Sequence, residues 1–341
     1  MEQNILSRIR TSLRQHHKNL ADWLTNSGKN GSLYLGKDGT SDGTITKADV
    51  PILAEIEHAL EHIEDGSFGQ CIVCNDEVEP ERLMIDFTTC VCLDHYSPGQ
   101  LRELEHDLEM AAKVQRHLLP GSTPVVDGIQ IAALSRPSGI VGGDYYDFFC
   151  YRDCLQGLAM GDVMGKGVPA SMLMASLQTS LRILGPDYDE LPLLTRRLNE
   201  LFRYNLKQIR FITLFLAALD PMGRTLRYTN AGHHPPLLLN GASGSSHWLK
   251  PTGPAIGLNP EADYASEQVQ LNAEDLLLLY TDGLVEARNG KEEFGQQRLA
   301  AYAEEHYSYS ATAFLNGLVR NVQEFADNPH DDLTVMVLKV E

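Results

Sequence analysis

The sequence predicts an α+β protein in which a helical N-terminal part precedes a larger domain with antiparallel sheets. Three observations support this prediction. The first third of the chain contains long stretches with helical periodicity. From residue 128 onward, short apolar runs alternate with turns rich in Gly, Pro and Asn, a pattern typical of strands. These strands and helices come in runs instead of strict alternation, which favours antiparallel sheets.

Composition sets the broad class of the protein. A chain of 341 residues suggests two domains, and 43% hydrophobic with 22% charged residues is typical of a soluble globular protein. The net charge of −18 argues against nonspecific nucleic-acid binding and against docking on anionic membranes, although a solvated acidic surface explains most of it. No run of about 18 apolar residues and no apolar signal core are present, so we expect a cytoplasmic protein.

Two helices joined by a loop are expected at the N-terminus. Residues 3–27 carry apolar side chains on one helical face, and residues 28–45 are rich in Gly, Ser and Asp. A second helix is expected over 47–65, with a narrow apolar stripe suited to a partner helix, and Gly66 ends it. The pattern predicts an antiparallel helical hairpin.

A cluster of cysteines follows the hairpin. Cys71 and Cys74 form C-x2-C, and Cys92 and His95 form C-x2-H. Two such pairs on two turns supply the four ligands that one tetrahedral zinc ion prefers. Cys90 competes with Cys92 for the third position, and we prefer Cys92 because it completes the second two-residue spacing.

Residues 46–96 resemble the DksA/TraR-type zinc finger family. The matching stretch is IEHALEHIEDGSFGQCIVCNDEVEPERL, followed by the second ligand pair. The resemblance implies a zinc finger domain over 1–97 and raises RNA polymerase as a partner. His95 stands where the family usually has cysteine, and the hairpin is short for a factor that reaches into the polymerase.

A third helix is predicted over 98–118, and Pro120 with Gly121 ends it. Its seam has the spacing of a coiled coil, so residues 98–120 would be a helical linker that either mediates a homodimer or packs on its own domain. The seam positions are Leu101, Leu104, Leu108, Ala111, Gln115 and Leu118.

The remaining residues, 121–341, form the second predicted domain. The expected strands are 129–134, 155–161, 213–219, 225–229, 235–239, 275–280 and 333–339. The expected helices are 168–184, 189–207, 295–305 and 311–326.

Aspartates stand beside several of these apolar runs. Asp144, Asp162, Asp282 and Asp331 each occur in such an element, and Asp332 adjoins the last. Because a strand end holds its carboxylate rigidly, several of them converging would create a site for hard divalent cations, which prefer oxygen ligands.

Residues 108–341 resemble the metal-dependent protein phosphatase (PPM) superfamily in its bacterial SpoIIE/RsbU-type branch. The ordered motifs are MAAKVQRHLLP, GGDYYDFF, GDVMGKGVPASM, FITLFLAALD, YTNAGHHPPLLL, YTDGLVEARN, EFG and DDLTVMVLKV. The resemblance implies a β-sandwich of two antiparallel sheets flanked by helices. It also implies hydrolysis of phosphoserine and phosphothreonine with two Mn²⁺ or Mg²⁺ ions.

The resemblance also assigns roles to individual residues. Asp162 would bridge the two metals, and the carbonyl of Val163 would complete one metal's ligands. Asp282 and Asp331 would bind the other metal, with Asp331 matching the family's offset better than its neighbour. Asp144 would hold a water ligand of one metal.

The general acid stays unassigned. Met164 stands where eukaryotic relatives have a histidine, and Lys166 either acts near the phosphate or only positions its loop. His233 and His234, in AGHHPP, are expected to shape a turn between strands.

The sequence therefore predicts a protein phosphatase that is regulated through an N-terminal zinc-binding domain. By resemblance, its substrate is a phosphorylated anti-sigma-factor antagonist. The alternatives are an RNA-polymerase-binding transcription regulator with an accessory phosphatase domain, and a catalytically inactive scaffold.

Overall fold

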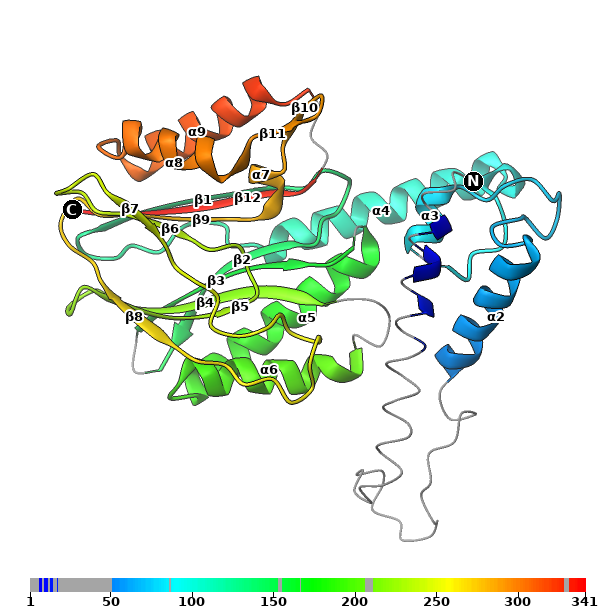
Figure 1. Ribbon diagram of the computed structural model, residues 1–341, viewed down its shortest axis with the longest axis horizontal. Helices are drawn as coiled ribbons and strands as arrows, with labels where there is room; N and C mark the ends of the chain where they lie inside the picture. The colour runs from blue at the N-terminus through cyan, green and yellow to red at the C-terminus, as the bar shows by residue number, and fades with distance from the viewer. Residues whose placement is uncertain are drawn as a thin grey trace, which may run out of the picture. The chain divides into compact units, whose positions relative to one another are not determined.

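The computed structural model describes residues 6–7, 9–11, 13–14, 17, 51–85, 87–152, 155–165, 167–205, 211–327 and 331–341 (Figure 1). The expected loop at 28–45 and the side chain of Lys166 lie outside these residues, as does most of the expected first helix. The chain divides into two compact units, Met1–Glu103 and Leu104–Glu341, and each is described by itself.

The first unit contains an antiparallel pairing at its N-terminus. Helix α2 (Pro51–Asp65) forms as expected, and the described residues between 6 and 14 are helical. Arg14 pairs with Glu64 and His17 with Glu57, so the residue numbers run in opposite directions along the two segments. This pairing has the direction of the predicted hairpin.

Three further helical segments follow, namely α3 (Pro80–Ile85), the 3₁₀ turn η2 (Leu93–His95) and α4 (Pro98–Leu118). Helix α4 starts where its sequence predicts, because Ser97 and Gln100 cap each other reciprocally and Pro98 occupies the first helical position. The helix begins in the first unit and ends in the second. No described helix is both long and apolar enough to cross a membrane.

The second unit contains two five-stranded antiparallel sheets, as predicted. The first sheet has the order β1 (Ile129–Arg136), β12 (Leu333–Val340), β9 (Leu276–Tyr280), β6 (Leu237–Leu239) and β7 (Ser246–Trp248). The second has the order β2 (Asp144–Tyr151), β3 (Leu155–Val163), β4 (Ile212–Asp220), β5 (Thr225–Ala231) and β8 (Glu267–Gln270).

The two sheets form the inner layers of a sandwich, with helices on both outer faces (Figure 1). Helices α5 (Val168–Leu184) and α6 (Leu191–Asn205) bury their apolar faces against the second sheet. Helices α8 (Gly295–His306) and α9 (Ala311–Phe325) do the same on the first sheet. A third apolar core fills the space between the sheets. The predicted α+β sandwich is thus confirmed.

Strand β2 is the main element that the apolar pattern did not predict. Its sequence, DYYDFFCY, carries two aspartates, yet Asp147 is fully buried. Arg182 of α5 donates to both of its carboxylate oxygens, at 2.8 and 2.9 Å, and Tyr145 donates a further hydrogen bond. Because this carboxylate is paired inside the fold, its charge does not exclude the segment from a sheet. The short β7, β8, β10 (Arg288–Asn289), β11 (Glu292–Glu293) and α7 (Asp282–Val285) were also not predicted.

Candidate functional site

Two of the predicted site residues lie directly opposite each other on neighbouring strands. Asp144 begins β2 and is paired in register with Asp162 near the end of β3. Beyond this pair, the amide of Val163 donates to the carbonyl of Gly143 at 3.3 Å. The hairpin between β2 and β3 therefore holds both carboxylates at one end of the second sheet.

The other predicted carboxylates come from the first sheet. Asp282 opens the short helix α7 immediately after β9, and Asp331 and Asp332 immediately precede β12. Strands β9 and β12 are neighbours, so these aspartates stand at adjacent strand ends. The site is thus assembled from both sheets of the sandwich.

Two threonines join the sheets at this point. The Thr281 hydroxyl donates to Asp144 Oδ2 at 2.7 Å and accepts from the Thr334 amide at 3.0 Å. Both threonines are fully buried. Neither threonine was predicted as a site residue. The position of Thr281, a polar residue between an apolar strand and Asp282, could have indicated a role in the site. Thr281 positions Asp144 from the opposite sheet.

Burial and like charges act strongly on these carboxylates. Burial, followed by the charges of Asp282 and Asp331, raises the pKa of Asp162 to about 7. Burial and then the charge of Asp162 raise the pKa of Asp144 well above its usual range. The Oδ1 atom of Asp144 is buried without a hydrogen-bond partner. Such a concentration of negative charge suits hard divalent cations, so the residues present fit the predicted metal site.

The side chain of Asp332 forms hydrogen bonds with the loop that precedes β2. Its Oδ1 accepts hydrogen bonds from the amide and hydroxyl of Ser138, and its Oδ2 accepts from the Gly143 amide at 2.7 Å. A β-carbon on Gly142 would lie 2.3 Å from Asp332 Oδ2, so the approach requires glycine there. Both oxygens of Asp332 are thereby committed to the loop before β2, which supports Asp331 as the ligand.

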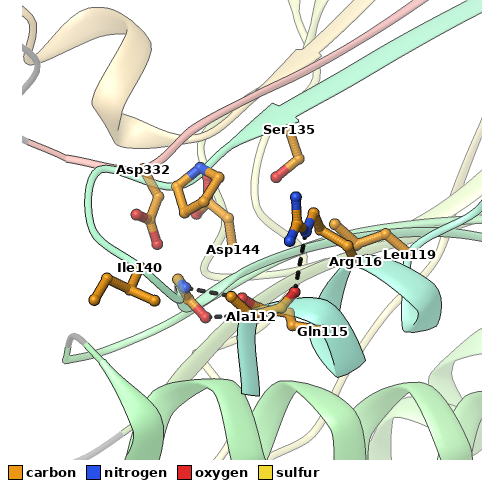
Figure 2. Close-up of a pocket in the computed structure, with 10 residues that line it drawn as sticks. Ala112, Gln115, Arg116, Leu119, Ser135, Ile140, Asp144 and Asp332 are labelled. Carbon is orange, nitrogen blue, oxygen red and sulfur yellow. Dashed lines mark hydrogen bonds between the residues drawn. The ribbon is translucent and has the colours of Figure 1, made fainter. Parts of the chain in front are cut away.

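The C-terminal part of helix α4 forms hydrogen bonds with the same loop, the one before β2. Gln115 donates to the carbonyl of Gly142 at 2.6 Å and accepts from its amide at 3.1 Å (Figure 2). A pocket of about 370 Å³ lies between the end of α4 and this loop, and Asp144 and Asp332 both line it. Gln115 is the one polar residue among the seam positions predicted for this helix. That exception could have indicated that its side chain positions another part of the chain.

Burial lowers the pKa of both histidines of the AGHHPP turn, which disfavours them as proton donors at neutral pH. His233 is buried, and burial followed by the nearby His234 lowers its pKa to about 3. Its Nδ1 forms a hydrogen bond with the Thr213 hydroxyl at 2.9 Å, and its amide donates to Asn230. These contacts support the prediction that the turn is structural.

A second candidate metal site lies in the first unit. The ligand atoms of Cys71, Cys74, Cys92 and His95 all lie within 4.8 Å of one another. Three of these ligands are thiols and one is an imidazole, and Cys71 and Cys92 are buried. Cys90 is exposed and uses its carbonyl to accept from Ile72, so it stands outside the group. This combination of ligand types is the one found in structural zinc sites.

Backbone amides support this cluster. Burial raises the pKa of the Cys71 thiol, but amides that include those of Cys92 and Val73 donate to its sulfur and lower the pKa to about 6. A thiol of this kind is readily present as the thiolate that binds metal. Glu79 accepts from the Leu93 amide and Arg82 donates to the Val91 carbonyl, so the EPERL element holds the second ligand pair in place.

Comparisons with known proteins agree with this geometry. The chain is 28% identical over 242 residues to phosphoserine phosphatase RsbU of Bacillus subtilis, covering 71% of this chain and 72% of that protein. The SiaA-PP2C domain of Pseudomonas aeruginosa superposes with a TM-score of 0.62 at 20% identity, over 71% of this chain and 98% of that one. The RsbU and RsbW domains of Rv1364c from Mycobacterium tuberculosis superpose with a TM-score of 0.57 at 26% identity, covering 64% of this chain and 63% of that one.

The family model described as stage II sporulation protein E matches residues 155–341. This segment includes β3 with Asp162, the turn with Asp282 and the final strand with its preceding aspartates. Since the match covers more than half of the chain, this protein belongs to the SpoIIE family.

Proposed function

We propose that this chain is a metal-dependent serine/threonine protein phosphatase that acts on a regulatory phosphoprotein. The observation that carries the proposal is the carboxylate group built across the sandwich from Asp144, Asp162, Asp282 and Asp331. The raised pKa of Asp162 supports it, because burial and neighbouring carboxylates that raise a carboxyl pKa are typical of a metal site. The similarity to a phosphoserine phosphatase points to the same reaction.

The chain's own residues would hold two Mn²⁺ or Mg²⁺ ions. Asp162 would bridge them, Asp282 and Asp331 would bind one, and the Val163 carbonyl would complete the other. Asp144, fixed by Thr281, would accept a hydrogen bond from a water beside the ions. When bound, such a pair of ions activates water and offsets the charge of the phosphoryl group. Among the residues that the structure describes we assign none as the general acid, and the neutral His233 is a poor candidate.

The substrate we propose is a phosphorylated anti-sigma-factor antagonist. The similarity to RsbU and to the combined RsbU and RsbW domains of Rv1364c supports a role in partner switching between regulatory proteins. The alternative, a polymerase-binding regulator, rests only on the resemblance of residues 46–96. The cytoplasm is the compartment that we propose for this function.

Manganese-dependent hydrolysis of a phosphoserine peptide tests the proposal. We expect turnover with Mn²⁺ or Mg²⁺, release of inorganic phosphate, and complete loss in excess EDTA. Turnover that persists in EDTA, or no turnover with any divalent cation, would favour the scaffold. Capture of RNA polymerase by the full chain, without phosphatase activity, would favour the polymerase-binding alternative.

We further propose that α4 couples the zinc-binding unit to catalysis through Gln115. In Gln115→Ala, both buried polar groups of Gly142 lose their partner, which costs about 1–3 kcal/mol in loop positioning. We expect kcat to fall about tenfold, equivalent to about 1.4 kcal/mol, while bound zinc is unchanged. Exposed Gln297→Ala on α8 is the control. Unchanged kcat in Gln115→Ala would disprove the coupling.

The acidity of Asp162 predicts how manganese binding depends on pH. Its pKa of about 7 in the metal-free chain means that protons compete with the metal below neutrality. We therefore expect Mn²⁺ affinity to rise about tenfold between pH 6 and pH 8. Calorimetric titration at pH 6, 7 and 8 measures this, and a constant affinity would contradict it.

A further inference from the structure

Two histidines on helix α2 face each other outside the cysteine cluster. His58 and His62 are four residues apart, so they share one face of the helix. Their Nε2 atoms lie 3.2 Å apart, and their rings are nearly perpendicular at 84°. Both side chains are accessible to solvent, so an ion could reach the nitrogens.

The hydrogen-bond role of His62 Nδ1 follows from the partners of Ser67. The Ser67 hydroxyl donates its single proton to Asp65 Oδ1, and the Ser67 amide donates to the same oxygen at 2.9 Å. Because the hydroxyl proton is used, the contact between Ser67 Oγ and His62 requires Nδ1 to donate. In the neutral ring this leaves the lone pair on Nε2, the atom that lies 3.2 Å from His58 Nε2.

This arrangement matches the way proteins orient histidine ligands. A metal-binding histidine usually donates its other ring nitrogen to a carboxylate or another oxygen, which fixes the ring and its tautomer. Two nitrogens, each about 2.05 Å from a tetrahedral zinc ion, lie about 3.3 Å apart. The observed separation of 3.2 Å is close to that value.

The surroundings favour a cation. The acidic residues of α2 are Glu55, Glu57, Glu61, Glu64 and Asp65. The pair also lies in the second half of the helix, where the carbonyl end carries partial negative charge. The turn after the helix is fixed by Gly66 at φ +80° and by the bond from the Phe68 amide to the His62 carbonyl.

We propose that His58 and His62 form a second, open site for a borderline divalent transition metal ion, zinc foremost, separate from the cysteine cluster. Ser67 and Asp65 act as positioning residues that hold His62 with its Nε2 lone pair outward. Water or an external ligand would fill the remaining positions. A plain hydrogen bond between the two rings is the competing explanation, and it predicts no added ion.

The proposal is tested by zinc titration of full-length chains whose cysteine cluster is already loaded with zinc. The number of further zinc ions bound is compared between wild type and histidine variants. His58→Gln should bind one fewer zinc ion than the wild-type chain. Exposed His106→Gln on α4, which has no histidine one turn away, should bind the same number as wild type. Because the carboxylate site is common to all three chains, its own zinc cancels in the comparison. Equal stoichiometry and affinity in wild type and His58→Gln would overturn the proposal.

A second variant tests the positioning residues without removing a ligand. Ser67→Ala keeps both imidazoles but loses the hydroxyl that fixes His62. We expect zinc affinity at this site to fall about tenfold, as for other residues that orient ligands. Nitrogen chemical shifts of the His62 ring should show zinc on Nε2 in wild type. Unchanged affinity in Ser67→Ala, or no zinc-dependent shift at Nε2, would count against the assignment.

Discussion

Asp162→Asn is expected to reduce manganese-dependent turnover by at least about a thousandfold. Asp162 is the proposed bridging ligand, and it is the carboxylate on which Asp282, Asp331 and Asp332 all act. An amide of the same shape removes the charge that would hold both ions. The loss of several kcal/mol of charge stabilisation corresponds to about three orders of magnitude in rate. Steady-state hydrolysis of a phosphoserine peptide at saturating Mn²⁺ measures the effect.

The same substitution should not weaken the fold of the metal-free chain. The pKa of Asp162 is raised in the folded state, so its ionisation opposes folding from about pH 4 upward, and fully above pH 7. The neutral asparagine removes this penalty, and we expect an equal or higher Tm at pH 8 without metal. Exposed Asp189→Asn is the matched control. If Asp162→Asn kept a tenth of the activity, Asp162 would not be the bridging ligand.

The parts of the fold that the sequence predicted are those set by local periodicity. Helix α4 has the expected bounds of 98 and 118, and α5 has the expected bounds of 168 and 184. Their apolar spacing and their terminal Pro and Gly residues are local signals. Strand β2 lacked such a signal, because the partner that neutralises Asp147 is Arg182, on a helix 35 residues away.

In the candidate site, too, contacts between residues far apart in the sequence could not be predicted. Aspartates at strand ends were visible in the sequence because Asp162 and Asp282 lie at the ends of apolar runs and Asp331 lies just before one. The contact between Thr281 and Asp144 joins residues 137 positions apart, and the contact between Gly143 and Asp332 joins residues 189 apart. Only the stacking of the two sheets creates these bonds. The supporting roles of Thr281, Asp332 and Gln115 could therefore not be derived from spacing alone.

Cys92→Ser is expected to abolish zinc binding and to unfold the segment around the cysteine cluster. The folded segment between 68 and 97 is small, and its described buried apolar side chains are Phe68, Val78 and Leu83 beside the ligands. So small a core does not fold stably without a disulfide or a bound metal ion. Structural zinc contributes about 10–16 kcal/mol in isolated zinc fingers, which exceeds what this core can replace. Zinc content and hydrogen exchange across 68–97 measure the two effects.

Cys90→Ser is the matched control, because Cys90 is exposed and two residues away in the sequence. It should keep its zinc and its exchange protection, which would settle the choice between Cys90 and Cys92. The opposite pattern, with zinc lost in Cys90→Ser and kept in Cys92→Ser, would reverse the assignment.

The second unit has its own three apolar cores, so Cys92→Ser should leave strands β3 and β4 protected. Hydrolysis of p-nitrophenyl phosphate by this variant then separates two roles of zinc. Turnover within a factor of two of wild type would mean that zinc only stabilises the first unit and does not affect catalysis. A change of tenfold or more, with Mn²⁺ affinity unchanged, would mean that the state of the zinc cluster reaches the carboxylate site. The covalent route between them is α4, and Gln115 is where that helix holds the loop of Asp144. If the zinc cluster acts through this contact, the double variant Cys92→Ser/Gln115→Ala should be no less active than Gln115→Ala alone.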